Sequence, residues 1–132
     1  MKLSTKTTYG LKAMIYLAKT KDKAVSLTEI AKGEGISIKY LEAIFAQLKK
    51  SGLVKSARGA SGGYSLATPI NKITLAQIFV SLEGEKALAS CSSNHKPKIC
   101  NFTCNCGVSQ VTDKLNTAIE MTLKKIKLGD LI

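Results

Sequence analysis

Apolar residues recur at helical spacing along the first part of the chain and predict two helices joined by a short polar loop. Residues 5–19 form one such segment behind a possible cap at Ser4 or Thr5, and a charged stretch ends it. Ser26 and Glu29 stand three positions apart, the spacing of a capping box in which each side chain satisfies the other's backbone amide. We therefore expect a second helix to begin directly after Ser26.

Glycines separate the second helix from a third. Gly33 and Gly35 are expected to break the second helix within two turns. Ile36 follows as an apolar residue that can pack into the core, and Ser37 can cap the third helix. Gly52 can end that helix in a left-handed conformation. One buried stripe is expected along this third helix, formed by Tyr40, Leu41, Ile44, Phe45 and Leu48. Two helices joined by a glycine-containing turn are typical of a helix-turn-helix.

A β-hairpin is expected after these helices. Residues 53–56 and 64–66 have strand character, and residues 58–63 between them form a glycine-rich turn. Such a hairpin is either a plain connection or the wing of a winged helix. Arg58, the only arginine, lies at the tip, from which a side chain can enter a minor groove, and this favours the wing.

The rest of the chain predicts two helices separated by a segment without periodicity. Thr74 caps the first, over residues 74–82, and Gly84 ends it; the second has an apolar seam from Val108 to Ile126. That long helix can pack on its own core or pair across a two-fold axis, and pairing is favoured because helix-turn-helix proteins usually act as dimers. The expected fold is mainly α: a winged helix-turn-helix DNA-binding domain with a small β-hairpin wing (1–83), a cysteine-rich loop (84–107), and a long C-terminal dimerisation helix with its tail (108–132).

The charge of the chain indicates a polyanionic partner. Twenty Lys and Arg residues against nine Asp and Glu give a net charge of +11. Residues 1–68 hold eleven Lys and one Arg against four acidic residues, a net of +8. A solvated, lysine-rich surface is the alternative. Because the excess is concentrated in the predicted winged helix, double-stranded DNA is favoured.

The sequence gives no sign of a membrane protein or an enzyme. Its densest apolar run, residues 13–18, is too short to span a bilayer, and no signal-peptide segment follows the first residues. It has no evident nucleophile–histidine pair, phosphate-binding loop or paired-carboxylate pattern, and suggests no small-molecule substrate. We therefore expect a cytoplasmic, non-enzymatic protein whose cysteines lie in a reducing compartment.

The four cysteines indicate a metal site. Cys91, Cys100, Cys104 and Cys106 fall within sixteen residues. Thiolates are the ligands that iron–sulfur clusters require, and four is the number that one cluster needs. The spacing contains no C-x2-C pair, which makes structural zinc less favoured, and a thiol–disulfide switch is a further alternative. His95 is a candidate ligand, although a solvated histidine is the more ordinary reading.

Several stretches resemble the Rrf2 family of bacterial winged-helix regulators, and together they cover essentially the whole chain. The matching stretches are Leu3–Tyr9, Ile30–Ala31, Gly35–Glu42, Leu48–Val54, Arg58–Tyr64 and Leu128–Leu131. The resemblance implies a dimeric DNA-binding transcription factor, with the helix from Ser37 in the major groove and Arg58 in the minor groove. The residues expected to contact DNA are Lys2, Ser4, Lys6, Thr28, Ser37, Lys39, Tyr40, Glu42, Lys55, Arg58, Gly59 and Ser61.

The resemblance also implies a cofactor. In the cluster-binding members of the family, three cysteines before the long helix hold an iron–sulfur cluster, and Cys91, Cys100 and Cys106 take these positions here. The fourth ligand varies within the family. Ser109 stands where one branch has a histidine, so Cys104 is the obvious substitute, with a partner-chain residue also open. A 2Fe–2S or 4Fe–4S cluster would make the protein a sensor of cluster status, redox state or nitric oxide.

Overall fold

Serine side chains begin the first three helices in the computed structural model, which describes residues 3–21, 23–59, 62–84 and 107–132. These helices are α1 (Thr5–Lys19), α2 (Leu27–Glu34) and α3 (Ile38–Lys50). The capping side chains are those of Ser4, Ser26 and Ser37, which accept from the backbone N–H of Thr7, Glu29 and Tyr40 respectively. Of the capping box predicted at Ser26, the hydrogen bond from the Glu29 N–H to the Ser26 hydroxyl is present. The Glu29 carboxylate instead accepts from the Tyr16 hydroxyl at 3.5 Å.

The expectation that Gly33 breaks the second helix is wrong. The helix continues through Gly33 and ends at Gly35, which has a left-handed φ of 66°. A Cβ on Gly33 would lie 2.6 Å from Cε2 of Tyr16. Gly33 therefore allows α1 and α2 to pack closely, whereas Gly35 supplies the turn that leads into α3.

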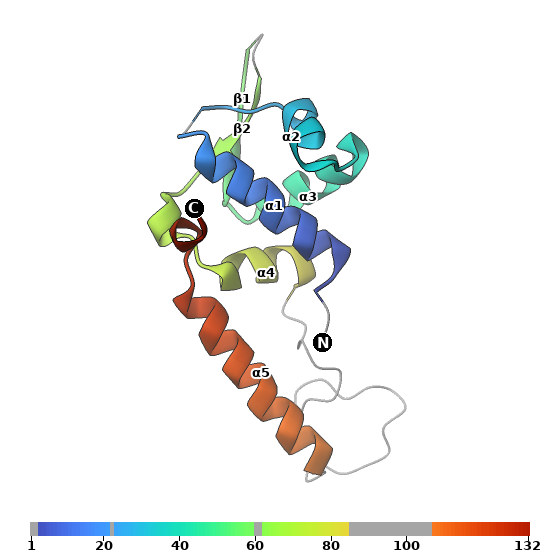
Figure 1. The fold of residues 1–132 in the computed structure, drawn as a ribbon, viewed down its shortest axis with the longest axis vertical. Coiled ribbons are helices and arrows are strands. Elements are labelled where there is room, and N and C mark those ends of the chain that lie inside the picture. Colours follow the sequence, from blue (N-terminus) through green and yellow to red (C-terminus); the bar gives the residue numbers. More distant parts are fainter. Residues whose placement is uncertain (1–2, 22, 60–61, 85–106) are drawn as a thin grey trace.

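The core of the molecule lies between α1, α3 and α4 (Leu75–Glu83), with α2 and the hairpin closing its edges (Figure 1). Four of the five residues in the stripe predicted on α3 are buried. The fifth, Tyr40, is 37% exposed, contrary to expectation. It lies in the first turn of α3, next to the exposed Lys39. The fully buried side chains include those of Met14, Leu17, Ile30, Leu41, Phe45, Leu48, Ile78 and Leu82.

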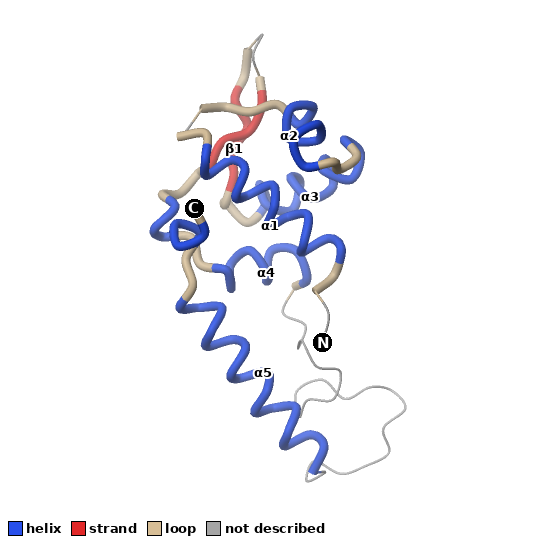
Figure 2. Tube along the Cα trace, in the orientation of Figure 1, coloured by secondary structure: helices blue, strands red, loops and turns tan. Residues whose placement is uncertain are grey.

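The hairpin consists of β1 (Val54–Ala57) and β2 (Gly63–Leu66), paired antiparallel with Val54 opposite Leu66 and Ala57 opposite Gly63. Its strands begin within one residue of their predicted positions. Val25 forms an isolated antiparallel β-bridge to the hairpin, because it exchanges both backbone hydrogen bonds with Tyr64, at 2.9 and 2.8 Å. Figure 2 shows that the hairpin projects from the body at the end opposite to α5 (Gly107–Lys125).

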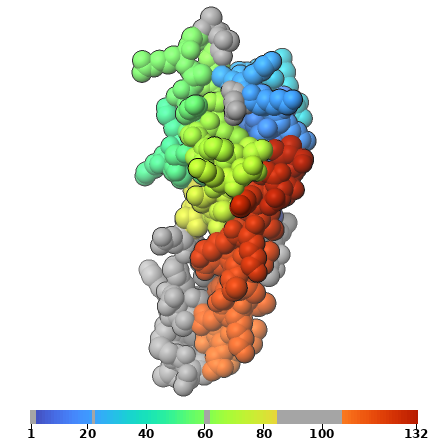
Figure 3. All heavy atoms as spheres, turned by 90° about the vertical axis from the view of Figure 1, so that its left-hand side faces the viewer, coloured from blue at the N-terminus to red at the C-terminus, as the bar shows by residue number. Residues whose placement is uncertain are grey.

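The C-terminal helix begins away from the body and leads the chain back to it (Figures 1 and 3). A short turn, η2 (Leu128–Leu131), follows α5 and packs beside a similar turn, η1 (Ile70–Lys72), that precedes α4. The side chain of Leu128 is completely buried. The sequence pattern does not reveal η1 or η2, because one turn is too short to show a period.

Candidate nucleic-acid interface

The first turns of α3 present an exposed surface of mixed chemistry. Ser37, Lys39, Tyr40 and Glu42, all predicted site residues, are exposed there. The turn between α2 and α3 holds them in place, because Ile36 is only 4% exposed and plugs into the core. The site residue Thr28 is also exposed, in the first turn of α2. The structure thus brings the two helices together as a helix-turn-helix with its polar residues outward.

Sequence reasoning missed one exposed residue of this surface. Ile38, the first residue of α3, is 43% exposed. Its spacing from Leu41 and Phe45 matches the buried stripe, so periodicity alone would place it inside. Its position before the first full turn is the signal that could have found it. Such an apolar side chain suits contact with a thymine methyl group.

The hairpin carries basic groups on the same side of the molecule as α3. In Figure 3 the green residues of the hairpin and the teal residues of α3 lie along one side, and α1, in blue, lies along the other. Lys55 and Arg58 are exposed, and the ammonium of Lys49 near the end of α3 donates to Ser56 of β1 at 3.0 Å. This hydrogen bond connects the hairpin to the helix beside it.

Gly59 and Gly62 lie on either side of the hairpin tip and are joined by a hydrogen bond. Gly59 has a φ of 127°, a value that side chains rarely permit, and its carbonyl accepts from the Gly62 N–H at 2.9 Å. Gly59 is itself exposed beside Arg58. The backbone can therefore approach another surface closely here, with the arginine next to it.

Two further predicted DNA contacts, Ser4 and Lys6, lie instead where α1 meets the end of α4. The Lys6 ammonium donates to the Leu82 carbonyl at 2.9 Å and is partly buried. The hydroxyls of Ser4 and Thr7 both donate to the Glu83 carboxylate. These contacts fasten the beginning of α1 to the end of α4, and the structure does not bring Ser4 and Lys6 to the exposed surface of α3.

The remaining predicted residues fall outside the described part of the chain. These are Lys2, Ser61, the four cysteines and His95. Within residues 3–21, 23–59, 62–84 and 107–132, no group of three or more His, Cys, Asp or Glu side chains could hold a metal ion. No helix in these ranges is long and apolar enough to cross a membrane.

Comparison with known proteins identifies the family. The sequence model of Rrf2, described as an iron-dependent transcriptional regulator, matches residues 3–132. A protein from Haemophilus influenzae named "Putative HTH-type transcriptional regulator" is 34% identical over 133 residues, which cover 100% of this chain and 87% of that protein. The chain therefore belongs to the Rrf2 family of DNA-binding transcriptional regulators, and it is not an enzyme.

Solved structures agree with the fold. CymR, the global cysteine regulator of B. subtilis, matches with a TM-score of 0.82 and 33% identity over 99% of this chain and 95% of its own. T. potens IscR matches with a TM-score of 0.77 and 38% identity over 99% of this chain and 85% of its own. The winged-helix architecture and the resemblance found in the sequence are both confirmed.

Proposed function

We propose that the first turns of α3 read base edges in the major groove of operator DNA, while the hairpin contacts the adjacent minor groove. The observation that carries this proposal is the exposure of Ser37, Lys39 and Tyr40 on α3, a helix that lies on the same side of the molecule as the basic hairpin. Exposed helix residues and a flexible basic wing are the two elements with which winged-helix proteins contact a duplex.

The exposed groups have chemistry suited to these contacts. Lys39 can bind a phosphate or a guanine edge, and Glu42 can accept from the exocyclic amine of cytosine. The Ser37 oxygen accepts from the Tyr40 N–H, so its hydroxyl hydrogen can donate to a phosphate at the helix N-terminus. Arg58 at the hairpin tip suits a narrow minor groove.

We propose further that two copies of the chain pair through α5. Val108, Val111 and Leu115 are 59%, 58% and 43% exposed and recur three and four positions apart. A second copy, related by a two-fold axis, would cover this apolar face. The two recognition helices would then read half-sites about 34 Å apart, one turn of the duplex.

We also propose that the segment between α4 and α5 holds an iron–sulfur cluster. The donor set fits this group, because four thiol side chains fall between Cys91 and Cys106 and clusters of this kind are held by cysteine thiolates. Cys91, Cys100 and Cys106 would supply three ligands and Cys104 the fourth. When bound, the cluster would supply a centre that responds to iron supply, redox state or nitric oxide.

The position of this segment in the chain supports a regulatory role. It follows Glu83, whose carboxylate binds the beginning of α1, and it leads directly into α5. A change in the segment would therefore bear on how α5 is placed relative to the winged helix. In a dimer, that placement sets the distance between the two recognition helices and hence the affinity for the operator.

A structural zinc ion or a thiol–disulfide switch at the same cysteines is the second candidate. The sequence favours it less, because the gaps between the cysteines contain eight, three and one residues, with no C-x2-C pair. Both candidates keep the same DNA-binding surface. They differ in colour, in metal content and in the response to oxidants.

A visible absorption spectrum of protein purified without oxygen, with iron, sulfide and zinc assayed on the same sample, separates the candidates. Brown protein with near-equal iron and sulfide is the expected result, and Cys104→Ala should then change the spectrum without abolishing the fold. Colourless protein with one zinc per chain would favour the second candidate. Colourless, metal-free protein, even after anaerobic reconstitution, would overturn the cluster proposal.

A further inference from the structure

Tyr9 of α1 contacts Tyr40 at the exposed end of α3. The two ring centroids lie 5.6 Å apart and the ring planes meet at 85°, an edge-to-face arrangement that aromatic pairs favour. Tyr9 is half-buried and Tyr40 is exposed. A residue outside the helix-turn-helix therefore touches one of the side chains on the proposed reading surface.

The helix that carries Tyr9 is fixed close to that residue. Lys6 donates to the Leu82 carbonyl, and Thr7 donates to Glu83. At Gly10, an added Cβ would lie 2.2 Å from Cδ1 of Leu82, so the backbone of α1 packs tightly against α4 there. The Tyr9 ring thus extends from a rigid support.

Tyr40 is exposed at the beginning of its own helix. It lies in the first turn of α3, and its neighbours Lys39 and Glu42 are exposed. A side chain that is ordered only when DNA binds loses rotamer entropy at that moment, which lowers affinity. A side chain already held by a ring contact avoids much of this loss, and the benefit is largest for the sequence that uses the held orientation.

We propose that Tyr9 is a positioning residue that determines DNA sequence specificity by holding the Tyr40 ring in its reading orientation. This inference rests on the proposed function, because it requires α3 to be the reading helix. Tyr9 acts through Tyr40 and need not touch DNA. The contact between Tyr9 and Tyr40 also connects the junction of α1 and α4 to the proposed reading surface within a single chain.

The test compares Tyr9→Phe with Tyr9→Leu and Tyr9→Met. The readout is the ratio of dissociation constants for a scrambled duplex and for a duplex that the wild-type protein selects from a random pool. Tyr9→Phe keeps the ring and should stay within about twofold of wild type, whereas Tyr9→Leu and Tyr9→Met should lower the ratio about three- to tenfold. Binding to the scrambled duplex should change little, since phosphate contacts remain.

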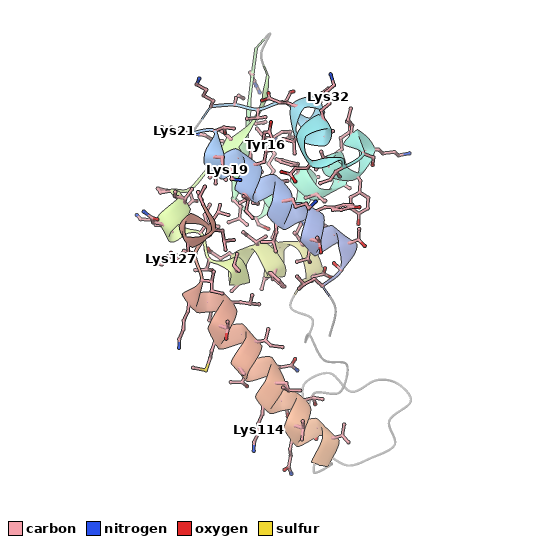
Figure 4. The ribbon with its side chains drawn as sticks, viewed as in Figure 1. Tyr16, Lys19, Lys21, Lys32, Lys114 and Lys127 are labelled. Atoms are coloured by element: carbon pink, nitrogen blue, oxygen red, sulfur yellow. The ribbon has the colours of Figure 1, made fainter. Side chains whose placement is uncertain are left out.

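Tyr16→Leu is the matched control. Tyr16 is a half-buried tyrosine farther along α1 (Figure 4), and its ring packs against Gly33 of α2. Its loss should lower the thermal midpoint but leave the specificity ratio unchanged. A purely structural role of Tyr9 would make its variants behave in the same way, and that result would overturn the proposal.

A double-mutant cycle gives the second test. In a Tyr40→Leu background, adding Tyr9→Leu should cause no further loss of specificity, because the ring to be held is already absent. An equal loss of the specificity ratio on adding Tyr9→Leu to wild type and to Tyr40→Leu would overturn the inference. So would an unchanged ratio in both the Tyr9→Leu and the Tyr9→Met single variants. Neither result would affect the proposed function. Failure of the wild-type protein to prefer any duplex would overturn the proposed function, and the inference with it.

Discussion

The backbone N–H of Leu128 donates to the carbonyl of Ile73 at 2.8 Å, and both side chains are completely buried. A second hydrogen bond, from the Leu75 N–H to the Ile126 carbonyl at 3.0 Å, runs in the opposite direction beside it. Together they join the end of α5 to the beginning of α4. The proposed dimer helix is therefore fastened to the winged helix at one end, while its other end follows the cysteine-rich segment.

Leu128→Ala should destabilise the protein by about 2–5 kcal/mol, the usual cost of truncating a fully buried leucine. The loss combines removal of apolar surface from the core with the cavity left between the body and the chain after α5. Urea unfolding followed by far-UV circular dichroism measures it. Leu131→Ala is the control, because Leu131 is 39% exposed, and it should cost much less. Equal effects of the two substitutions would contradict the proposed anchoring.

Leu115→Glu should prevent the proposed pairing of two copies through α5. It places a charge in the exposed apolar face of α5, where desolvation on pairing would be strongly unfavourable. Analytical ultracentrifugation measures the change, with Lys114→Glu as the neighbouring control. A variant that still sediments as a dimer would show that copies pair through another surface.

Arg58→Ala should weaken binding to the selected duplex by about 1–3 kcal/mol. The reason is the loss of the one guanidinium at the hairpin tip, because this planar cation can enter a narrow minor groove. Fluorescence anisotropy titration measures the affinity. Lys114→Ala removes a charge on α5, distant from the hairpin (Figure 4), and should cost far less. Unchanged affinity of the Arg58→Ala variant would show that Arg58 at the hairpin tip does not contribute to DNA binding.

Gly63→Ala should destabilise the hairpin by about 1–3 kcal/mol or more. An added Cβ would lie 2.3 Å from the carbonyl oxygen of Val25, a backbone atom that cannot move without breaking its pairing with Tyr64. Thermal unfolding measures the loss. Gly107→Ala meets no neighbour within 4 Å and should be tolerated. A fully stable Gly63→Ala variant would show that the β-bridge between Val25 and Tyr64 is easily displaced.

The local signals of the sequence were sufficient to locate the main helices and the hairpin. Serine caps, left-handed glycines and apolar spacing act within a few residues, so they can be read from the chain directly. Gly33 was misjudged because a glycine that ends a helix and one that admits a neighbouring ring look alike in sequence. Only the packing of Tyr16 against it distinguishes the two cases.

The site required information that local patterns do not contain. Tyr40 matched the buried stripe but is 37% exposed, whereas Leu41 beside it is completely buried. The contacts of Lys6 with Leu82 and of Tyr9 with Tyr40 join residues far apart in the chain. Leu128 gave no periodic signal, and its burial depends on where α5 returns the chain. The resemblance to the Rrf2 family indicated a DNA-reading role for the exposed turns of α3. The spacing of apolar residues alone did not indicate this role.

A variant with both Lys39→Ala and Glu42→Ala tests whether the exposed turns of α3 read DNA sequence. Anisotropy titrations over a range of salt concentrations would compare this variant with wild type on the selected and scrambled duplexes. We expect wild type to prefer the selected duplex by at least about 10³-fold and the variant to lose about tenfold or more of that preference. We also expect the variant to retain most of its salt-dependent binding to the scrambled duplex. A variant with the same preference as wild type would contradict the assignment of α3 as the reading helix.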